Sequence, residues 1–312
     1  MAVAVVIPTC NRPGPVKSML QSILDGSMVP EELMVVDQSK GPETENLVGD
    51  LRRRYPFLKY ERDTGTGTSH AKNLGWSRVS SELVCFTDDD AEVDHYWLES
   101  LVTVLDANAD CGAAGGRIDI PNLDDYRPLV FPKDKMYLMP YLNFGEQTKM
   151  FHDGSYPVGV NMITRRDLLS KLGGFNEDLG PNYAKRRPIS GEESDYCHRV
   201  HLLGFSLIYV GNAIVRHPFT RERNTLAFVK KRLKMELYTQ AVFDLNCEPF
   251  YKYFYKAIYP VMRIVAHKLK GRNDSQLDKY LLWEEFKSYL VALFRAPRSI
   301  RRSRKNLKTL LQ

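Results

Sequence analysis

Short apolar runs alternate with amphipathic segments through the first third of the chain. The runs have the length of strands, and the segments between them carry apolar residues at helical spacing. The predicted strands are residues 3–8, 32–37 and 83–87, and the predicted helices are residues 15–24, 43–55 and 69–79. Continuous apolar strands separated by helices are typical of a parallel sheet with both faces covered. We therefore predict an α/β, Rossmann-like fold with a mostly parallel sheet flanked by helices.

Polar side chains stand at the ends of these predicted strands. Thr9 follows the first run and Asp37 ends the second. The third run leads directly into Asp88, Asp89 and Asp90. The carboxyl ends of parallel strands meet at one edge of a sheet, and ligands bind there. We therefore expect these side chains to converge at one edge.

The three consecutive aspartates need compensation. Adjacent carboxylates repel one another, and burying an unpaired charge is costly. A divalent cation removes this repulsion, and Mg²⁺ and Mn²⁺ prefer carboxylate and phosphate oxygens. The alternative is a solvated turn in which Asp94 caps the following helix. The position directly after a buried run favours the metal site.

Charge is distributed unevenly along the 312 residues, which carry +6 overall. Residues 221–312 hold 21 Lys and Arg against 8 Asp and Glu, or +13, whereas residues 1–220 hold 23 against 30, or −7. An acidic body with a basic end indicates two functions in two regions. We predict an α/β domain over residues 1–222 and a basic, aromatic-rich helical extension over residues 223–312.

Neither a spanning segment nor a secretion signal is expected. No apolar run approaches the ~18 residues that a membrane-spanning helix needs. The start, MAVAVVIPTCNRP, has a short apolar part without a basic region before it, so we interpret it as a buried strand. The five cysteines are scattered and never form a Cys-x-x-Cys pair, which argues for reduced thiols in the cytoplasm and against zinc.

Seven motifs follow one another along the chain, namely VVIPTCNRP, MVVDQSKGPET, GTSHAKNLGW, FTDDDAEVDHYWLE, VGVNMITRRDLLSKLGGFNEDLG, GEESDYCHR and IVRH. The same order is found in inverting family 2 glycosyltransferases of the GT-A fold, so residues 1–220 resemble that family. The resemblance implies that residues 1–222 form a catalytic domain. This domain would transfer a sugar from a nucleotide diphosphate to an acceptor hydroxyl, with Mn²⁺ or Mg²⁺ neutralising the diphosphate.

The aspartate run matches the Asp-x-Asp motif of the family. The resemblance implies that Asp90 is a direct metal ligand, and that Asp88 lies near the sugar or ribose and can also bind the metal. Asp89 fills the variable position beside the nucleotide. His217 matches a histidine that can complete the metal shell, and an ordinary surface or core histidine is the alternative.

The resemblance also implies a set of nucleotide contacts. They are Pro8, Thr9, Asn11, Asp37, Gln38 and Lys72. The alternatives are a helix cap for Thr9, a turn carboxylate for Asp37 and an exposed helix charge for Lys72. Gln38 stands where the family often has a second acid, and an amide both donates and accepts hydrogen bonds. The donor is therefore expected to be a UDP-, dTDP- or GDP-sugar.

Inversion in one displacement needs a carboxylate base that reaches the acceptor hydroxyl. Glu192, Glu193 and Asp195 are the candidates, and alignment of the motif gives the base position to Glu193. The alternative is a capping box in which Glu193 bonds back to the backbone of Ser190. Asp195 and Arg199 are spaced so that they could pair on one helix face.

Basic residues outside these motifs form further groups. We interpret Lys185, Arg186 and Arg187 as a solvated loop, with a phosphate clamp as the alternative. Residues 249–272 mix aromatic and basic side chains, and residues 295–312 hold seven basic residues and no acid. This mixture favours an anionic membrane surface. A lid or dimer surface is the alternative, and nucleic acid is disfavoured because no recognition motif accompanies the charge.

These patterns together favour a metal-dependent inverting glycosyltransferase that acts on a lipid-linked glycan at the inner face of the cell membrane. The same chemistry on a soluble protein or natural-product acceptor is the nearest alternative. A sugar nucleotidyltransferase would carry a Gly-rich basic loop after its first strand, and PTCNRPGP is a poor version of one. A silent binding module is disfavoured because clustered carboxylates without a ligand cost stability.

Overall fold

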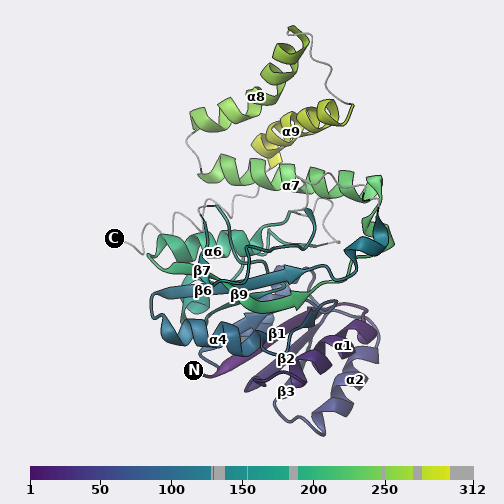
Figure 1. Ribbon diagram of the computed structural model, residues 1–312, viewed down its shortest axis with the longest axis vertical. Coiled ribbons are helices and arrows are strands. Elements are labelled where there is room, and N and C mark those ends of the chain that lie inside the picture. Colours follow the sequence, from purple (N-terminus) through teal and green to yellow (C-terminus); the bar gives the residue numbers. More distant parts are fainter. Residues whose placement is uncertain are drawn as a thin grey trace.

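The structure is a computed structural model that describes residues 1–127, 129, 138–152, 154–182, 189–247, 250–269 and 276–295. A nine-stranded mixed sheet carries helices on both faces, and three further helices lie at one end (Figure 1). The strand order is β3-β2-β1-β4-β8-β6-β9-β5, with β7 paired to β9. The predicted α/β class is confirmed.

The amino-terminal part supplies the parallel half of the sheet. Its strands are β1 (Val3–Thr9), β2 (Glu32–Asp37), β3 (Leu58–Arg62) and β4 (Leu83–Phe86), and its helices are α1 (Pro13–Leu24), α2 (Glu43–Arg52) and α3 (Thr68–Ser77). Thr9 pairs in register with Asp37, so the ends of β1 and β2 are level. The sequence pattern missed β3 because this half-buried edge strand alternates apolar and charged residues and has no continuous apolar run.

The second half makes the sheet mixed. β8 (Met162–Arg165) lies between β4 and β6 (Cys111–Asp119) and is antiparallel to both. β9 (Ser206–Arg216) runs parallel to β6. The remaining elements are β5 (Glu92–Val93), β7 (Lys149–Met150), α4 (Trp97–Ala107), α5 (Arg166–Leu172), α6 (Glu192–Leu202) and the 3₁₀ turns η1 (Leu123–Tyr126) and η3 (Arg221–Arg223).

Two apolar layers hold the helices against the sheet. Val5 of β1 packs in the layer that contains Leu20 of α1 and Leu101 of α4. Its neighbour Val6 points to the opposite face and packs in the layer that contains Val200 of α6. This alternation is the period of a strand buried on both faces, as the apolar runs predicted.

The carboxylate of Asp94 does not cap α4. The residue before this helix is Tyr96, and no side chain caps the helix start. Arg216 of β9 instead donates a 2.6 Å hydrogen bond to Asp94. The proposed cap is therefore wrong, and Asp94 ties the segment before α4 to β9.

A buried asparagine holds an irregular part of the sheet. β6 and β9 shift register between Gly116 and Arg117. The Asn161 amide spans this shift and donates to the carbonyl oxygens of Arg117 (2.9 Å) and Ala213 (2.8 Å). Its own oxygen accepts a 2.9 Å hydrogen bond from the Trp97 indole. The shift is thus held in place by the hydrogen bonds of one buried side chain.

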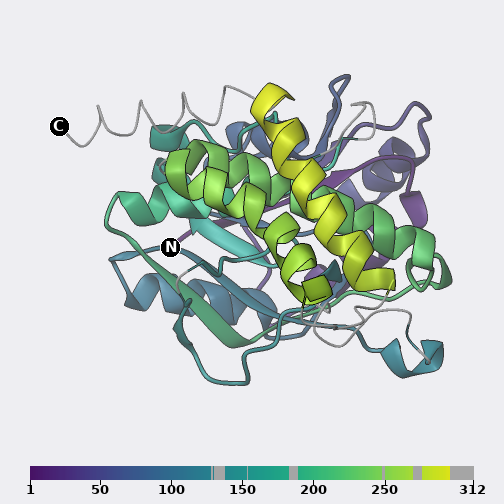
Figure 2. The same ribbon diagram turned by 90° about the horizontal axis from the view of Figure 1, so that it is seen from above.

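The three carboxyl-terminal helices are docked on the sheet domain. They are α7 (Leu226–Cys247), α8 (Phe250–Leu269) and α9 (Gln276–Arg295). α7 lies across the sheet domain, with α8 and α9 on its far side (Figures 1 and 2). Val229 and Leu233 of α7 share an apolar cluster with Ile120 and Phe219 of the sheet domain.

A buried acid joins the three helices to one another. Asp244 of α7 accepts a hydrogen bond from the Tyr289 hydroxyl of α9 and a 2.8 Å bond from the Lys256 ammonium of α8. None of the helices in the described ranges combines the length and apolarity needed to cross a bilayer. Most of the basic run, residues 296–312, lies outside the described residues, as does the 185–187 group.

Replacing Gly116 by alanine is expected to destabilise the sheet. A Cβ there would clash with the carbonyl oxygen of Ala213 and lie 2.7 Å from the Asn161 amide nitrogen, and the backbone cannot swing away. We expect Gly116→Ala to lower the free energy of unfolding by about 1–3 kcal/mol, measured by urea denaturation. Gly49, exposed on α2 with nothing near its missing Cβ, is the matched control. Gly49→Ala should be neutral or stabilising by up to about 1 kcal/mol, and equal losses in both variants would contradict this account.

Candidate active site

The aspartate run lies directly beyond the carboxyl end of β4. His217 follows β9 and is 4% exposed. Ligand atoms of Asp88, Asp90 and His217 all lie within 4.8 Å of one another. Strands that are far apart in sequence thus bring together the three residues that the sequence pattern proposed as metal ligands. Two carboxylates and an imidazole are a donor set that can hold a divalent metal ion.

Two arginines close over Asp90. Arg12, in the turn after β1, donates hydrogen bonds to Asp89 (3.1 Å) and Asp90 (2.9 Å). Arg223 of η3 lies 3.5 Å from Asp90 and 3.2 Å from the His217 ring. Burial alone would raise the pKa of Asp90, but His217 and the two arginines hold it well below its ordinary value. Asp90 is therefore ionised under all physiological conditions.

Asp89 ties the ends of β1 and β4 together. The Thr9 hydroxyl donates a 2.6 Å hydrogen bond to it. Burial raises the pKa of Asp89 to about 6, against the hydrogen bond from Thr9 and the charge of Arg12. Burial likewise raises the pKa of Asp88, although the charge of Lys72 opposes it. The expected convergence of these strand ends is therefore present.

Lys72 is a buried cation between two glutamates. It lies on α3 and is 1% exposed, so the alternative of an exposed helix charge is wrong. Its ammonium donates a hydrogen bond to Glu193 and lies 3.5 Å from Glu192. Gly159 makes room for this cluster, because a Cβ there would clash with Glu193 and Lys72.

The charges of this cluster control one another. Burial alone would lower the pKa of Lys72, but the charges of Glu193, Glu192 and Asp88 raise it above its ordinary value. Burial and the charge of Glu193 raise the pKa of Glu192 to about 8. Burial alone would raise the pKa of Glu193, yet the charge of Lys72 outweighs burial and holds this pKa below its ordinary value. The cluster therefore favours a proton on Glu192 over one on Glu193 and keeps Lys72 charged.

The capping box considered for Ser190 and Glu193 does not form. α6 begins after Gly191, which has a positive φ of 92°, and no side chain caps the helix. The Ser190 N–H instead donates to the Thr239 hydroxyl of α7 at 3.1 Å. That alternative is wrong, and the Glu193 carboxylate is turned toward Lys72.

Asp195 lies apart from the Lys72 cluster. Arg199, one turn further along α6, donates a 2.9 Å hydrogen bond to it, and both side chains are buried. The same arginine donates to the carbonyl oxygens of Leu172 and Gly174, each at 2.8 Å. The expected helix pair therefore exists, and it anchors α6 to the end of α5.

The expected nucleotide residues after β1 form an exposed turn. Pro8 lies within β1 opposite Val36. Asn11 takes a positive φ of 57°, which asparagine tolerates better than most residues. Its N–H donates a 2.6 Å hydrogen bond to the Ser39 hydroxyl, which joins this turn to the one after β2. The Thr9 hydroxyl donates to Asp89, as described above, and does not cap a helix.

Asp37 and Gln38 are occupied by protein groups. Asp37 is fully buried, and its two oxygens accept from the Ser39 N–H and the Tyr60 hydroxyl, each at 2.8 Å. The Gln38 amide donates to Asp63 at 2.7 Å and accepts from the Gly67 N–H at 3.2 Å. Both side chains therefore shape the turn in which they lie.

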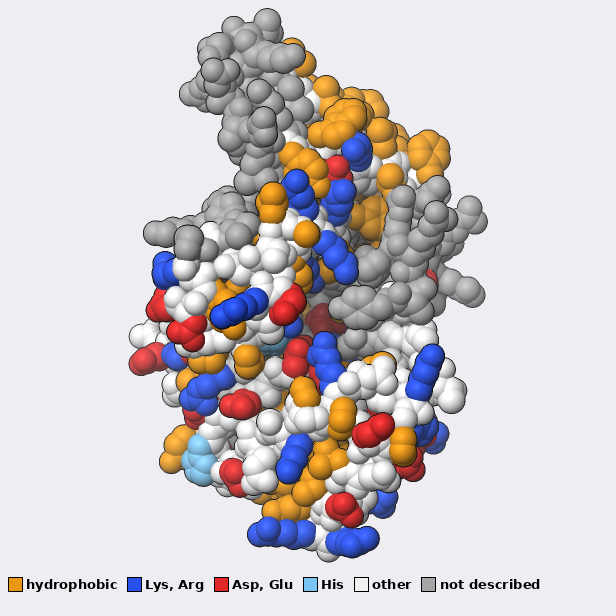
Figure 3. Space-filling view, turned by 90° about the vertical axis from the view of Figure 1, so that its right-hand side faces the viewer, with side chains coloured by type: hydrophobic (Ala, Val, Ile, Leu, Met, Phe, Trp, Pro, Cys, Tyr) orange, Lys and Arg blue, Asp and Glu red, His pale blue; other side chains and the backbone are white. Residues whose placement is uncertain are grey.

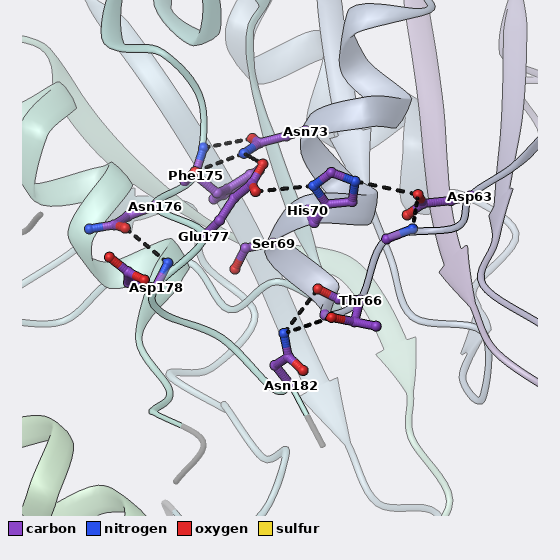
Figure 4. A network of polar contacts seen from close by, with 12 residues as sticks. Asp63, Thr66, Ser69, His70, Asn73, Phe175, Asn176, Glu177, Asp178 and Asn182 are labelled. Atoms are coloured by element: carbon purple, nitrogen blue, oxygen red, sulfur yellow. Dashed lines mark hydrogen bonds and ion pairs between the residues drawn. The ribbon is translucent and has the colours of Figure 1, made fainter. Parts of the chain in front are cut away.

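A chain of polar contacts runs from the end of β3 to the loop after α5 (Figure 4). His70 of α3 contacts Asp63 at 3.3 Å and Glu177 at 3.0 Å. The hydrogen bond to Glu177 outweighs partial burial and raises the pKa of His70. Asn73, one turn further on, donates to the carbonyl oxygen of Phe175 at 2.8 Å. This network fixes the loop that leads towards α6.

Sequence reasoning missed four residues of this site, namely Arg12, Arg223, Asp63 and Gly159. Arg12 and Gly159 lie inside motifs that were recognised, so their place in the motif was the available signal. Asp63 follows the edge strand that the pattern missed. Arg223 stands at the edge of the predicted extension, and nothing local marks it as a partner of Asp90.

Comparison with known proteins places the chain in a family. A family model described as "Glycosyl transferase family 2" matches residues 4–173. The chain belongs to glycosyltransferase family 2. The glucosyl-dolichyl phosphate glucuronosyltransferase of Haloferax volcanii is 25% identical to this glycosyltransferase over 250 residues, which cover 78% of each chain.

Two solved structures share the fold of this glycosyltransferase. A mannosyltransferase from Pyrobaculum calidifontis, in complex with GDP-Man and Mn²⁺, has a TM-score of 0.56 and 18% identity over 99% of this chain and 74% of its own. GalNAc-T7 with UDP, GalNAc and Mn²⁺ has a TM-score of 0.60 and 15% identity over 95% of this chain and 58% of its own. The predicted GT-A fold is confirmed.

The raised pKa of Glu192 has a measurable consequence. The folded protein keeps this proton at pH values where the unfolded chain has lost it, so the free energy of unfolding should fall as pH rises towards 8. Glu192→Gln removes the titration. Between pH 6 and pH 9 we expect the free energy of unfolding of the wild type to fall by about 2 kcal/mol more than that of the variant, measured by urea denaturation.

The matched control for this measurement is Glu92→Gln, which removes an exposed carboxylate of β5. Its stability should follow the wild type at every pH. Parallel curves for the wild type and Glu192→Gln would mean that Glu192 is ionised throughout this range.

Proposed function

We propose that this glycosyltransferase is a metal-dependent inverting enzyme that moves a sugar from a nucleotide diphosphate-sugar to a hydroxyl of a lipid-linked glycan intermediate. One observation carries the proposal. Lys72 donates a hydrogen bond to Glu193, and its charge also interacts with Asp88, a member of the Asp88, Asp90 and His217 cluster. One buried cation thus links the candidate metal site to the candidate base.

The metal side suits a diphosphate. Asp88, Asp90 and His217 would hold Mn²⁺ or Mg²⁺, which neutralises the diphosphate when bound. Arg12 and Arg223 approach Asp90 from two further elements, and guanidinium groups pair well with phosphate. These two arginines are placed to exchange their bonds with Asp90 for bonds with the phosphate oxygens.

The acceptor side suits a general base. Lys72 keeps Glu193 ionised, so this carboxylate is ready to take the proton of an incoming hydroxyl. The raised pKa of Glu192 makes it the member of the pair that keeps its proton, so it adds no second negative charge beside Glu193. We assign Asp195 to its buried pair with Arg199 rather than to proton transfer.

The nucleoside side is formed by Pro8 and Thr9 at the end of β1 and by Asn11 in the turn after it. We assign Asp37 and Gln38 to shaping the turn after β2, because their polar atoms already have protein partners. An occupied Gln38 amide does not select among UDP, dTDP and GDP. Asp63 at the same corner is equally occupied, because its oxygens accept hydrogen bonds from the Gln38 amide and the Gly65 N–H, each at 2.7 Å.

The lipid-linked acceptor is supported by a relative and by α8. The Haloferax volcanii relative is named for glucosyl-dolichyl phosphate. α8 buries Tyr253 and Ala257, and it exposes a stripe of large apolar and aromatic residues on its opposite face. The stripe contains Tyr251, Phe254, Tyr255, Tyr259, Met262 and Val265. Such a helix suits a membrane surface, and in Figure 3 hydrophobic side chains gather at the end of the molecule formed by the three carboxyl-terminal helices.

Two variants should separate donor binding from chemistry. With Mn²⁺ or Mg²⁺, one of the UDP-, dTDP- or GDP-sugars should raise the melting temperature of the wild type. Asp90→Asn should weaken this binding about tenfold or more, because it removes a metal ligand. Glu193→Gln should keep the shift and lose about 10²–10⁴-fold in donor turnover, because it removes only the base. Thermal shift and nucleotide release measure the two effects.

The control variant is Asp50→Asn, which changes an exposed carboxylate of α2. It should match the wild type in both assays. A wild type that no sugar nucleotide stabilises, or a Glu193→Gln variant with wild-type turnover, would falsify the proposed mechanism.

The exposed stripe of α8 predicts binding to anionic vesicles. Tyr251, Tyr255 and Met262 are 70%, 60% and 55% exposed, so their replacement by serine removes no core contact. Because each apolar side chain buried in the bilayer contributes about 1.5 kcal/mol or more, the triple variant should float with phosphatidylglycerol vesicles at least about tenfold less well. A Tyr96→Ser and Met150→Ser variant, altered at exposed sites of the sheet domain, should float like the wild type. Equal flotation of all three proteins would show that the stripe of α8 does not bind the vesicles.

A further inference from the structure

A groove runs between α7 and α9, away from the candidate active site. It encloses about 740 Å³, within the range of small-molecule sites. α7 contributes Lys230, Lys231, Lys234, Met235 and Tyr238, and α9 contributes Tyr280, Glu284, Lys287, Ser288 and Val291. Because these residues recur at helical spacing, each helix presents one continuous face to the groove.

The walls of the groove carry an excess of positive charge. Four lysines line it against a single acid, Glu284. The carboxylate of Glu284 is shared, at 3.8 Å from Lys234 and 3.2 Å from Lys287. The ammonium groups of Lys230 and Lys234 lie 5.1 and 5.9 Å from the centre of the Tyr280 ring. A phosphate group is the complement of such a wall.

The rest of the lining is apolar or aromatic, through Ala227, Met235, Tyr238, Tyr280 and Val291. A bare ion would leave this surface exposed to water, whereas a hydrocarbon chain attached to a phosphate would cover it. The groove belongs to the same three-helix group as the exposed stripe of α8. In Figure 3 the basic side chains of this end lie next to hydrophobic ones. The chemistry of the groove is therefore that of an anionic amphiphile.

α7 separates the groove from the candidate active site. Val229 and Leu233 face the sheet domain, and Lys230 and Lys234 face α9. At the start of α7, η3 places Arg223 beside Asp90. A molecule held in the groove would have to pass around this end of the helix to reach the catalytic cluster. It must span the thickness of α7, which is about 10 Å with its side chains.

We propose that the groove between α7 and α9 binds the polyprenyl phosphate end of the acceptor, while the glycan extends around the start of α7 to Glu193. The assignment rests on the proposed function for the identity of the acceptor. The lysines bind the phosphate, and the apolar lining receives the first part of the isoprenoid chain. The acceptor glycan must then be long enough to pass α7.

The test uses the full chain and phosphatidylcholine vesicles that contain either polyprenyl phosphate or phosphatidylglycerol at equal charge. The wild type should float with the polyprenyl phosphate vesicles at a lower content of anionic lipid. Lys230→Gln with Lys234→Gln should remove this preference, with a loss of roughly tenfold or more. Lys230→Arg with Lys234→Arg should keep it. Lys17→Gln with Lys171→Gln, two exposed lysines of the sheet domain, is the matched control.

Each outcome decides the proposal. Equal flotation of the wild type with both vesicles, or an unchanged preference in the glutamine variant with a wild-type melting temperature, overturns it. Equal stabilisation of the wild type by inorganic phosphate and by polyprenyl phosphate would assign the lysines to a free anion and also overturn it. Stabilisation of the wild type by a sugar nucleotide is measured separately. A groove that does not bind the lipid can therefore be distinguished from an active site that does not bind the donor.

Discussion

The structure depends on the compensation of Lys72 by the carboxylates around it. A buried ammonium without a partner is costly, and here it touches Glu193, lies near Glu192 and interacts with Asp88. These partners come from α6 and from the end of β4. One lysine therefore fixes the distance between two helices and one strand, and it sets which carboxylates are ionised. Breaking this contact would leave buried charge on both sides.

The second cluster, around Asp90, is also held by ion pairs. Arg12 and Arg223 approach one carboxylate and His217 lies beside it, so two guanidinium groups that can bind phosphate oxygens stand at the candidate metal site. The two clusters are linked through Asp88, which belongs to the aspartate run and also senses the charge of Lys72. An anion entering one cluster therefore changes the electrostatic environment of the other.

The carboxyl-terminal helices contribute to this arrangement and do not merely extend the chain. α7 is tied to both clusters. The η3 turn that precedes it supplies Arg223 to the Asp90 cluster. Thr239, within α7, accepts a hydrogen bond from the N–H of Ser190, two residues before Glu192. Its far face forms a basic groove with α9, and α8 carries an exposed aromatic stripe. A movement of α7 would therefore be felt at both sides of the catalytic centre.

The sequence alone determined the strand and helix pattern, the family and the edge of the sheet where the site lies, because strand period and motif order are local properties. It placed Asp88, Asp90 and His217 in one cluster through the resemblance. Only the tertiary structure decided that Lys72 meets Glu193, 121 residues away, that Arg223 covers Asp90, and that Gly191 rather than a capping box starts α6. These contacts join residues distant in the chain, and side-chain pairing across such distances leaves no periodic signal in a single sequence.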